Sequence, residues 1–177
     1  MRNTIKIEYF KTPFGELILG SVKNKLCLCD WRYRKMRTSI DNRLKTGLNA
    51  DFIEESSNIV TETQTQLTQY FNGERTEFNI PLLLIGSDFQ KSVWDALLQI
   101  PFGKTDTYLG LSKKLGNRKA IRAVATANGA NAISIIIPCH RIIGSDGGLV
   151  GYAGGLDVKK KLLYLENALI NNQLSLF

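Results

Sequence analysis

Two short stretches in the first half of the chain consist mostly of apolar residues. Residues 17–22 and 26–31 have the composition of β-strands, and the polar Lys-Asn-Lys between them is typical of a turn. The pattern predicts a β-hairpin. Apolar residues then recur at helical spacing from Ile59 to Phe71, and Gly73 follows where a C-terminal cap is expected, which predicts a helix.

The other segments of the first half carry weaker signals. Residues 32–55 are polar and irregular, which predicts a loop or a weak helix. Residues 76–86 predict a strand followed by a connector, because a central strand would not tolerate Pro81. Together these elements predict an α/β N-terminal domain over residues 1–85, built from a small antiparallel sheet and a helix.

The second half of the chain has the pattern of short helices. Ser87 and Gln90 have the form of a capping box, and the apolar face that follows them ends before Pro101. A last helix follows a glycine-rich loop, with residues at helical spacing from Leu156 onward. We therefore expect a mostly α C-terminal domain over residues 86–170.

Two of these short helices have the form of a helix-turn-helix. The first begins at Thr105 or Thr107 and ends at Gly116, and the second lies within residues 117–129. The second helix is rich in small residues, which allow close approach to a partner, and it carries one long cation, Arg122. Two packed helices with no role in nucleic-acid binding would show the same periodicity, so the pattern alone leaves both interpretations open.

Positive charge is concentrated in the second half. The net charge of the chain is +7; residues 1–88 have 12 basic and 11 acidic side chains, whereas residues 89–177 have 11 basic and 5 acidic ones. Such a surface suits a polyanion, and a merely solubilising surface is the alternative. The basic residues in and around the two helices, which only Asp106 opposes, favour DNA; they are Lys104, Lys113, Lys114, Arg118, Lys119 and Arg122.

Composition indicates a globular protein that needs no stabilising metal or disulfide. Hydrophobic residues make up 44% of the chain, no apolar run is long enough to cross a membrane, and the N-terminus lacks the apolar segment of a signal peptide. We therefore expect a soluble cytoplasmic protein in which Cys27, Cys29 and Cys139 are free thiols. The only histidine, His140, is far from Cys27 and Cys29, which favours buried thiols there over a zinc site.

The stretch IIIPCHRIIG places that histidine next to a cysteine. Residues 133–137 form an apolar run that predicts a buried strand, and Pro138 favours an extended residue before it. Neighbouring residues on a strand face opposite ways, so Cys139 and His140 cooperate only if the chain turns or a water bridges them. A base reached through water, assisted by nearby helix N-termini or by Arg141, would raise the thiolate fraction. A buried cysteine beside a hydrogen-bonding histidine is the alternative.

The residues around this pair carry a long and specific resemblance. The segment FQKSVWDALLQIPFGKTDTYLGLSKKLGNRKAIRAVATANGANAISIIIPCHRIIGSDGGLVGYAGGLDVKKKLLYLE, residues 89–166, is similar to the catalytic domain of the methylated-DNA–protein-cysteine methyltransferases. The first 85 residues are similar, more loosely, to the variable N-terminal α/β domain of that family. The resemblance implies single-turnover DNA repair without a cofactor. Cys139 would accept an alkyl group from the 6-oxygen of guanine, with the 4-oxygen of thymine as a further candidate, and the protein would be inactivated.

The resemblance also implies roles for residues of the motif. His140 would activate Cys139 through a water molecule and be oriented by Glu166. Asn131 would support the strand and turn near the thiol. Tyr108 would assist rotation of the nucleotide and protonate the leaving guanine.

The same resemblance implies an unusual way of binding DNA. A helix-turn-helix usually reads the major groove, whereas members of this family dock in the minor groove, where Arg122 would replace the flipped base. The expected DNA-binding residues are Thr107, Arg122, Ala123, Ala127 and Arg141. The expected guanine pocket consists of Val150, Tyr152, Ala153 and Gly154.

The chain departs from the family pattern at two places. Ala132 stands where a proline usually follows the motif asparagine, which makes the entry to the next segment less rigid. The histidines of the N-terminal zinc site that some relatives carry have no counterpart, so no metal is expected.

The last five residues, QLSLF, resemble the peptide by which bacterial replication and repair proteins dock on the sliding clamp. Within the tail, residues 171–177, the anchors would be Gln173, Leu174, Leu176 and Phe177. A frayed amphipathic terminus is the alternative.

Three other functions could use the same features. A Cys-His-Glu hydrolase would release many product molecules per protein, whereas alkyl transfer gives one. A lesion-recognition module would bind damaged DNA without chemistry, and a transcription regulator would need a base-reading face that the sequence does not show. A monomer is sufficient for a lesion present in one copy.

Overall fold

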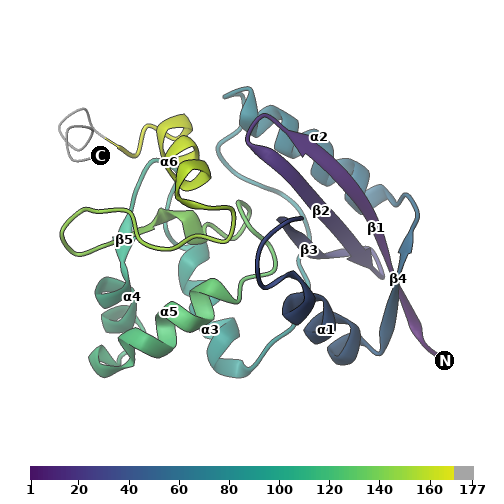
Figure 1. The fold of residues 1–177 in the computed structure, drawn as a ribbon, viewed down its shortest axis with the longest axis horizontal. Coiled ribbons are helices and arrows are strands. Elements are labelled where there is room, and N and C mark those ends of the chain that lie inside the picture. The colour runs from purple at the N-terminus through teal and green to yellow at the C-terminus, as the bar shows by residue number, and fades with distance from the viewer. Residues whose placement is uncertain (170–177) are drawn as a thin grey trace. The chain divides into compact units, whose positions relative to one another are not determined.

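The computed structural model describes residues 1–169 and divides the chain into two compact units (Figure 1). The first unit is Met1–Ser87 and the second begins at Asp88. The first is a β-sheet with two helices, and the second consists mainly of helices, so the predicted fold class is confirmed. Within residues 1–169, none of the helices has the length and apolar character needed to cross a bilayer.

A four-stranded sheet forms the first unit. Its strands are β1 (Asn3–Thr12), β2 (Gly15–Val22), β3 (Lys25–Trp31) and β4 (Ala50–Glu54), in the order β3-β2-β1-β4. Strands β2 and β3 form the predicted hairpin, and its turn residues Lys23 and Asn24 both have positive φ, as tight hairpin turns require. The sheet is mixed rather than purely antiparallel as predicted, because β4 pairs in parallel with β1.

Two helices accompany the sheet. The predicted helix is present as α2 (Asn58–Phe71), which Ser57 caps by accepting a hydrogen bond from the Val60 amide at 3.2 Å. Residues 32–55, predicted as a loop or weak helix, contain α1 (Arg37–Leu48) and β4. The signal was weak because α1 buries only Ile40 and Leu44, and because β4 depends on pairing with a strand at the start of the chain.

Residues 76–86 do not form the predicted strand. A single parallel bridge joins Leu26 to Leu82. The Leu26 amide donates to the Pro81 carbonyl at 2.9 Å, and the Leu83 amide donates to the Leu26 carbonyl at 2.8 Å. Proline has no amide proton of its own, which limits how far such a ladder extends.

The two cysteines of β3 lie in the interior. Cys27 and Cys29 are both buried free thiols, as predicted. Burial raises the pKa of Cys27 to about 12 and also raises the pKa of Cys29. Both therefore stay protonated, and poorly nucleophilic, near neutral pH.

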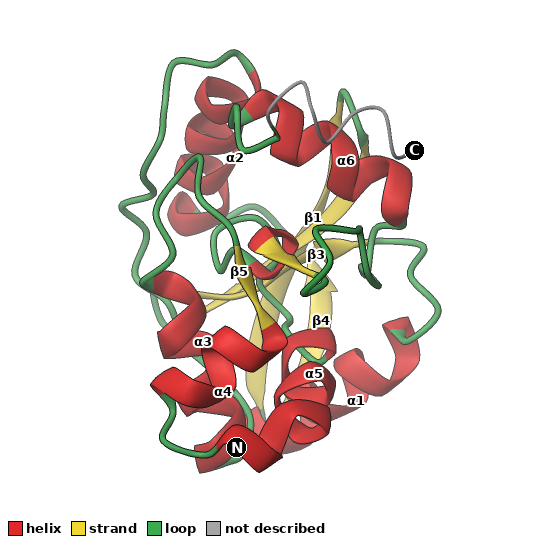
Figure 2. Cartoon of the chain, turned by 90° about the vertical axis from the view of Figure 1, so that its left-hand side faces the viewer, coloured by secondary structure: helices red, strands yellow, loops and turns green. Residues whose placement is uncertain are grey.

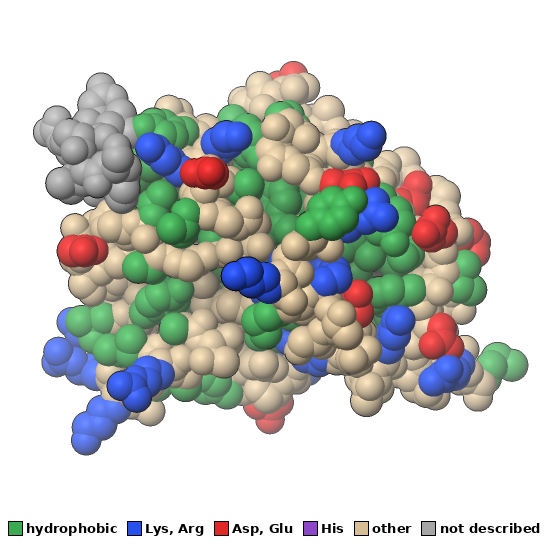
Figure 3. All heavy atoms as spheres, in the orientation of Figure 1, with side chains coloured by type: hydrophobic (Ala, Val, Ile, Leu, Met, Phe, Trp, Pro, Cys, Tyr) green, Lys and Arg blue, Asp and Glu red, His purple; other side chains and the backbone are tan. Residues whose placement is uncertain are grey.

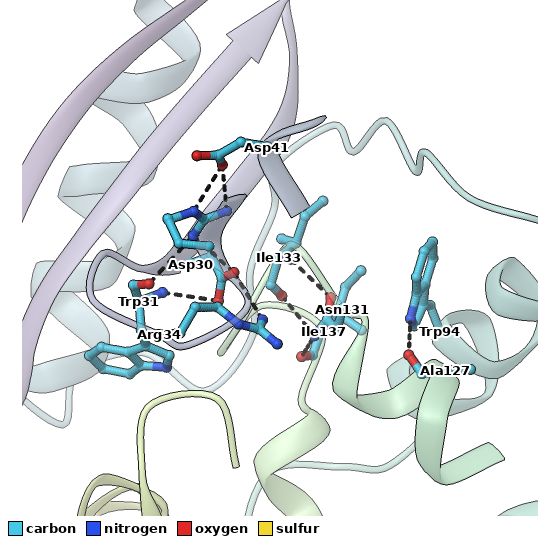
Figure 4. Close-up of polar contacts among 10 residues, drawn as sticks. Asp30, Trp31, Arg34, Asp41, Trp94, Ala127, Asn131, Ile133 and Ile137 are labelled. Carbon is cyan, nitrogen blue, oxygen red and sulfur yellow. Dashed lines mark hydrogen bonds and ion pairs between the residues drawn. The ribbon is translucent and has the colours of Figure 1, made fainter. Parts of the chain in front are cut away.

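A buried carboxylate near the end of β3 organises the chain that follows it (Figure 4). Asp30 is fully buried and forms ion pairs with Arg34 and Arg37, each at 3.0 Å. Arg37 is the first residue of α1, so this network links β3 to that helix. Removing one partner of such a buried pair costs about 3–5 kcal/mol.

The second unit is mainly helical. Its helices are α3 (Asp88–Leu98), α4 (Tyr108–Lys114), the 3-10 turn η1 (Arg118–Ala120), α5 (Ile121–Gly129), the 3-10 turn η2 (Cys139–Arg141) and α6 (Leu156–Leu165). A two-residue strand β5 (Asp106–Thr107) pairs in parallel with β6 (Ile142–Ile143). This pairing brings the start of α4 close to the chain that follows η2.

Helices α3, α4 and α5 pack against one another (Figure 2), and α4 and α5 are the predicted helix-turn-helix. Thr107 caps α4 by accepting a hydrogen bond from the Gly110 amide at 2.9 Å. Gly116 takes a left-handed φ of 78° just after α4, a conformation that glycine adopts without steric cost. Asn117 then caps η1, which leads directly into α5.

Residues 133–137 are buried, as predicted, but they form turns rather than a strand. Ile135 has a φ of 71°, which is rare for a β-branched residue. The Ile136 amide donates to the Ser134 carbonyl at 2.8 Å, and the Ile137 amide donates to the Ile133 carbonyl at 3.0 Å. The segment therefore satisfies part of its backbone hydrogen bonding locally.

Candidate active site

Cys139 lies in the interior of the second unit, at the first position of η2. Its side chain is only 3% exposed, and its amide donates to the Ile137 carbonyl at 2.8 Å. Cys139 and His140 lie in a 3-10 turn and not in a strand, so their side chains are not forced to opposite faces. The thiol is thus held on a tight backbone turn.

Asn131 fixes the shape of the chain that leads to the thiol (Figure 4). Its side-chain amide donates to the Ile137 carbonyl at 2.9 Å and to the Ile133 carbonyl at 3.3 Å, and its oxygen accepts from the Ile133 amide at 2.9 Å. One buried side chain therefore ties both ends of residues 133–137 together. Ala132, which replaces the proline of the family pattern, is buried within the same turn.

His140 and Glu166 form a buried hydrogen bond. His140 Nε2 lies 2.7 Å from Glu166 Oε1, and both side chains are almost completely buried. Burial alone would raise the pKa of Glu166, but the hydrogen bonds and charges of His140 and Arg141 lower it to about 2. An ionised carboxylate only accepts hydrogen bonds, so His140 Nε2 carries the proton and donates it.

The other ring nitrogen of His140 is the candidate base. Because Nε2 donates to Glu166, a neutral imidazole keeps its lone pair on Nδ1. Burial, assisted by the positive charges of Arg141 and Lys159, lowers the pKa of His140 despite the opposing effect of Glu166. Within residues 1–169, Nδ1 is buried and forms no direct hydrogen bond. A neutral base with an open lone pair is what proton removal from a thiol requires.

Arg141 supports the same carboxylate. Its Nε donates to Glu166 Oε2 at 2.8 Å and its second terminal nitrogen donates to Oε1 at 3.0 Å, while the other terminal nitrogen donates to the Ile100 carbonyl at 2.6 Å. The side chain is 7% exposed. Predicted as a DNA-binding residue, Arg141 has its guanidinium committed to groups inside the unit.

Tyr108 is the first residue of α4 and lies near the thiol. Burial raises the pKa of Tyr108, the negative charge of Cys139 raises it further, and a hydrogen bond with Asn128 opposes both effects. Asn128 is buried near the end of α5. The phenol is therefore protonated near neutral pH and can donate a proton.

The glycine-rich loop before α6 contains the predicted pocket residues. The ring of Tyr152 is 6.4 Å from that of His140, with the planes inclined at 70°. Val150, Ala153 and Gly154 are half-buried. This part of the loop thus lies close to the catalytic candidates.

Lys159 is a buried site residue that sequence reasoning missed. Its side chain is fully buried, and Nζ donates to the carbonyls of Val150 at 2.5 Å and Gly151 at 3.3 Å. Helical spacing could have revealed it, because the buried stripe of the last helix is Lys159, Leu162, Leu163 and Glu166. A lysine at a position on the apolar face of the predicted helix was the signal in the sequence that this side chain is buried.

The outer face of α5 presents a mixture of cationic and small side chains. Arg122 and Ala123 are exposed, whereas Ala127 is buried and its carbonyl accepts a hydrogen bond from Trp94 Nε1 at 2.9 Å (Figure 4). Thr107 uses its hydroxyl to cap α4. The carbonyl of Ala127 and the hydroxyl of Thr107 therefore accept hydrogen bonds within the unit. Arg122 and Ala123 are accessible to a partner.

Basic residues gather on the helix-turn-helix. The Lys and Arg side chains over α4, η1 and the start of α5 form a blue group at the lower left of Figure 3. Lys114 forms an ion pair with Asp106 at 2.8 Å, and Asp106 is the one acidic side chain among them. All six predicted basic residues are exposed; they are Lys104, Lys113, Lys114, Arg118, Lys119 and Arg122.

The two remaining predictions concern a metal site and the C-terminal tail. Within residues 1–169, no group of three or more His, Cys, Asp or Glu side chains is arranged to hold a metal ion. The predicted clamp-docking anchors, residues 173–177, lie outside the described residues.

Comparison with known proteins covers both units. A family profile described as "6-O-methylguanine DNA methyltransferase, DNA binding domain" matches residues 88–168, and one described as "6-O-methylguanine DNA methyltransferase, ribonuclease-like domain" matches residues 5–84. The methylated-DNA–protein-cysteine methyltransferase of Methanosarcina barkeri is 43% identical over 159 residues, which cover 90% of this chain and 95% of that protein. The Mycobacterium leprae protein of the same name is 42% identical over 169 residues, 94% of each chain.

A solved structure extends the likeness to three dimensions. The crystal structure of Mycobacterium tuberculosis OGT in complex with DNA has a TM-score of 0.78 and 37% sequence identity. The match covers 98% of this chain and 99% of that one.

Proposed function

Because this chain belongs to the 6-O-methylguanine DNA methyltransferase family, we propose that Cys139 is the residue onto which it transfers an alkyl group from guanine in DNA. The protein repairs DNA directly, by alkyl transfer to its own cysteine. Of its three cysteines, Cys27 and Cys29 stay protonated inside the first unit. The observation that favours Cys139 is its position beside the hydrogen-bonded pair of His140 and Glu166.

His140 removes the proton from the thiol through one water molecule. Its Nδ1 is the open lone pair, and Glu166 holds the ring through Nε2 and stabilises the positive charge while the imidazole carries the extra proton. Arg141 keeps Glu166 ionised and oriented. The lowered pKa of His140 means that the imidazole passes the proton on toward solvent rather than retaining it.

The transfer step is a displacement at carbon. The thiolate sulfur of Cys139 forms a bond to the alkyl carbon as that carbon's bond to the guanine 6-oxygen breaks, and the electron pair of that bond stays with guanine. Tyr108 donates its phenolic proton to the leaving guanine, and the phenolate recovers a proton from water. The product on the protein is a thioether, which no group of the site cleaves, so each molecule reacts once.

The DNA contacts place the lesion at the thiol. Arg122 enters the minor groove and occupies the space of the flipped nucleotide, and Ala123 lets the helix approach closely. The surrounding basic residues bind phosphates without sequence preference. Val150, Tyr152, Ala153 and Gly154 line the site of the flipped guanine, and Arg141 supports Glu166 from inside the unit.

The direct test is the mass of the intact protein after incubation with an oligonucleotide that contains one 6-O-methylguanine. The wild type should gain one methyl group and no more, and peptide mapping should locate it on Cys139. Cys139→Ser should gain none while it still binds the oligonucleotide. Continued release of product without a mass gain would instead support a hydrolase, and binding without any transfer would support lesion recognition alone.

The C-terminal segment is a separate proposal. The sequence QLSLF at residues 173–177 supports docking on the bacterial sliding clamp, which would bring the protein to replicating DNA.

We also propose a cytoplasmic location. The DNA substrate and the reduced thiol that the reaction needs both suit that compartment.

A further inference from the structure

Lys159 is buried without a carboxylate partner. Its side chain is fully buried on α6, and within residues 1–169 its ammonium forms no ion pair. The ammonium instead donates to the backbone carbonyls of Val150 and Gly151. Burial of a lysine charge is costly unless another charge compensates for it. A charge of this kind at an active site calls for an explanation.

The charged groups around Cys139 do not balance while its thiol is neutral. Lys159 and Arg141 each bring a positive charge, Glu166 brings the one negative charge, and His140 is neutral by the lowered pKa. Arg141 and Glu166 already form an ion pair. Ionisation of Cys139, with release of the proton to solvent, supplies the negative charge that Lys159 lacks.

Helix α6, which carries Lys159, packs against the turn η2, which carries Cys139. Burial lowers the pKa of Lys159 to about 8, and the negative charge of Cys139 acts in the opposite direction. Coupling of this kind is reciprocal, so the charge that favours the ammonium is itself favoured by it. Tyr108, the remaining titratable group that faces Cys139, is neutral and leaves this balance unchanged.

We propose that Lys159 is a positioning residue for the transfer reaction: held by the Val150 and Gly151 carbonyls, its ammonium is the counter-charge that stabilises the Cys139 thiolate. The inference rests on the proposed function, because it assumes that Cys139 is the acceptor. In addition to the proton relay through His140, the protein then has a positive charge that stabilises the thiolate. His140 determines how the proton leaves, and Lys159 determines how much of the thiolate is present.

The first test is the pH dependence of single-turnover transfer from a 6-O-methylguanine oligonucleotide at saturating DNA. In Lys159→Met, the apparent pKa of the rate should rise by about one unit, so that the rate near neutral pH falls about tenfold and recovers as the pH is raised. Lys159→Arg keeps the charge and should retain most of the wild-type profile. Lys161→Met, an exposed neighbour on the same helix, should match the wild type.

A uniform loss of rate at every pH in Lys159→Met would assign the lysine to loop structure alone and overturn the proposal. Absence of methyl transfer to Cys139 in the wild-type protein would instead overturn the proposed function. Failure of the Lys159 proposal and failure of the proposed function are therefore distinguishable. Thermal unfolding and binding of undamaged DNA check that the variants fold.

A second measurement takes its readout from the wild-type protein and uses a variant only to assign one signal. Lysine ¹³Cε signals can be titrated before and after methylation, with the Lys159 signal identified by Lys159→Arg. Methylation converts the thiolate to a neutral thioether, so the titration midpoint of Lys159 should fall by at least half a unit, while that of Lys161 stays constant. An unchanged midpoint for Lys159 would overturn the proposal.

Discussion

His140 Nε2 donates a hydrogen bond to Glu166 Oε1 over 2.7 Å, in the buried interior of the second unit. The two residues are 26 positions apart in the chain, and α6 carries Glu166 to the histidine. This bond determines which ring nitrogen of His140 is open to accept a proton. Several measurable properties of the protein depend on it.

Glu166→Gln should slow transfer without a large change in side-chain volume. A neutral amide can donate to Nε2, which would put the proton of a neutral imidazole on Nδ1 and leave no base toward the thiol. We expect the single-turnover rate to fall about 100-fold, the lower end of what a positioned general base contributes. A rate equal to that of the wild type would mean that Nδ1 is not the base.

The protein should lose stability in acid because of this same pair. The folded-state pKa of Glu166, about 2, is below its ordinary value of 4.5, so the carboxylate contributes stability above pH 4.5 that is lost as pH falls toward 2. The shift corresponds to about 3 kcal/mol. The lowered pKa of His140 acts in the same direction below 6.5. Urea unfolding across this pH range should show a smaller loss in Glu166→Gln, and an equal loss would contradict the assignment.

Arg122→Ala should impair repair of duplex DNA while leaving the fold intact. The side chain is exposed, so the free energy of unfolding should change by less than about 0.5 kcal/mol. Without the arginine, no side chain fills the space that the flipped nucleotide leaves in the base stack, so the flipped state is less stable. The transfer rate on duplex DNA should therefore fall about tenfold or more. Transfer from a single-stranded oligonucleotide should fall much less.

Arg118→Ala is the matched control for Arg122→Ala. Arg118 is also exposed and basic but lies in η1, before α5, the helix that we propose enters the groove. The Arg118→Ala substitution should weaken binding to damaged and undamaged DNA equally and reduce the salt dependence of binding by about one unit of slope. If both variants changed DNA binding and transfer in the same way, Arg122 would not have the proposed role of replacing the flipped nucleotide.

Asn131→Ala should destabilise the turn that holds the thiol. The substitution removes the side-chain partner of the Ile133 amide and one of the two donors to the Ile137 carbonyl, which keeps the Cys139 amide. Each buried group left unsatisfied costs about 1–3 kcal/mol. Thermal unfolding should therefore show a clearly lower midpoint, together with slower transfer. An unchanged midpoint would mean that the turn is stable without this side chain.

Deletion of residues 173–177 should abolish binding to purified bacterial sliding clamp, measured by surface plasmon resonance. Transfer from a short oligonucleotide should be unaffected, because the deletion leaves the proposed site intact. Absence of clamp binding by the full-length chain would refute the docking proposal.

Local signals in the sequence predicted several elements well. The hairpin of β2 and β3, the helix α2 and the two helices of the helix-turn-helix all depend on periodicity and capping residues such as Thr107 and Asn117. Caps and tight turns are decided within a few residues, so they can be recognised without a fold. The adjacency of Cys139 and His140 was likewise visible in the chain itself.

Distant contacts decided the rest. Strand β4 exists because it pairs with β1, a strand at the start of the chain. The turn of residues 133–137 depends on the nearby Asn131 side chain, which the apolar pattern alone did not indicate. The sequence by itself determined the short elements, the basic surface and the reactive pair. Only the tertiary structure decided that the Arg141 guanidinium pairs with Glu166 and that the Lys159 ammonium is buried against the carbonyls of the loop before α6. The energy of a buried charge depends on partners that are far away in the chain, and the fold alone brings those partners together.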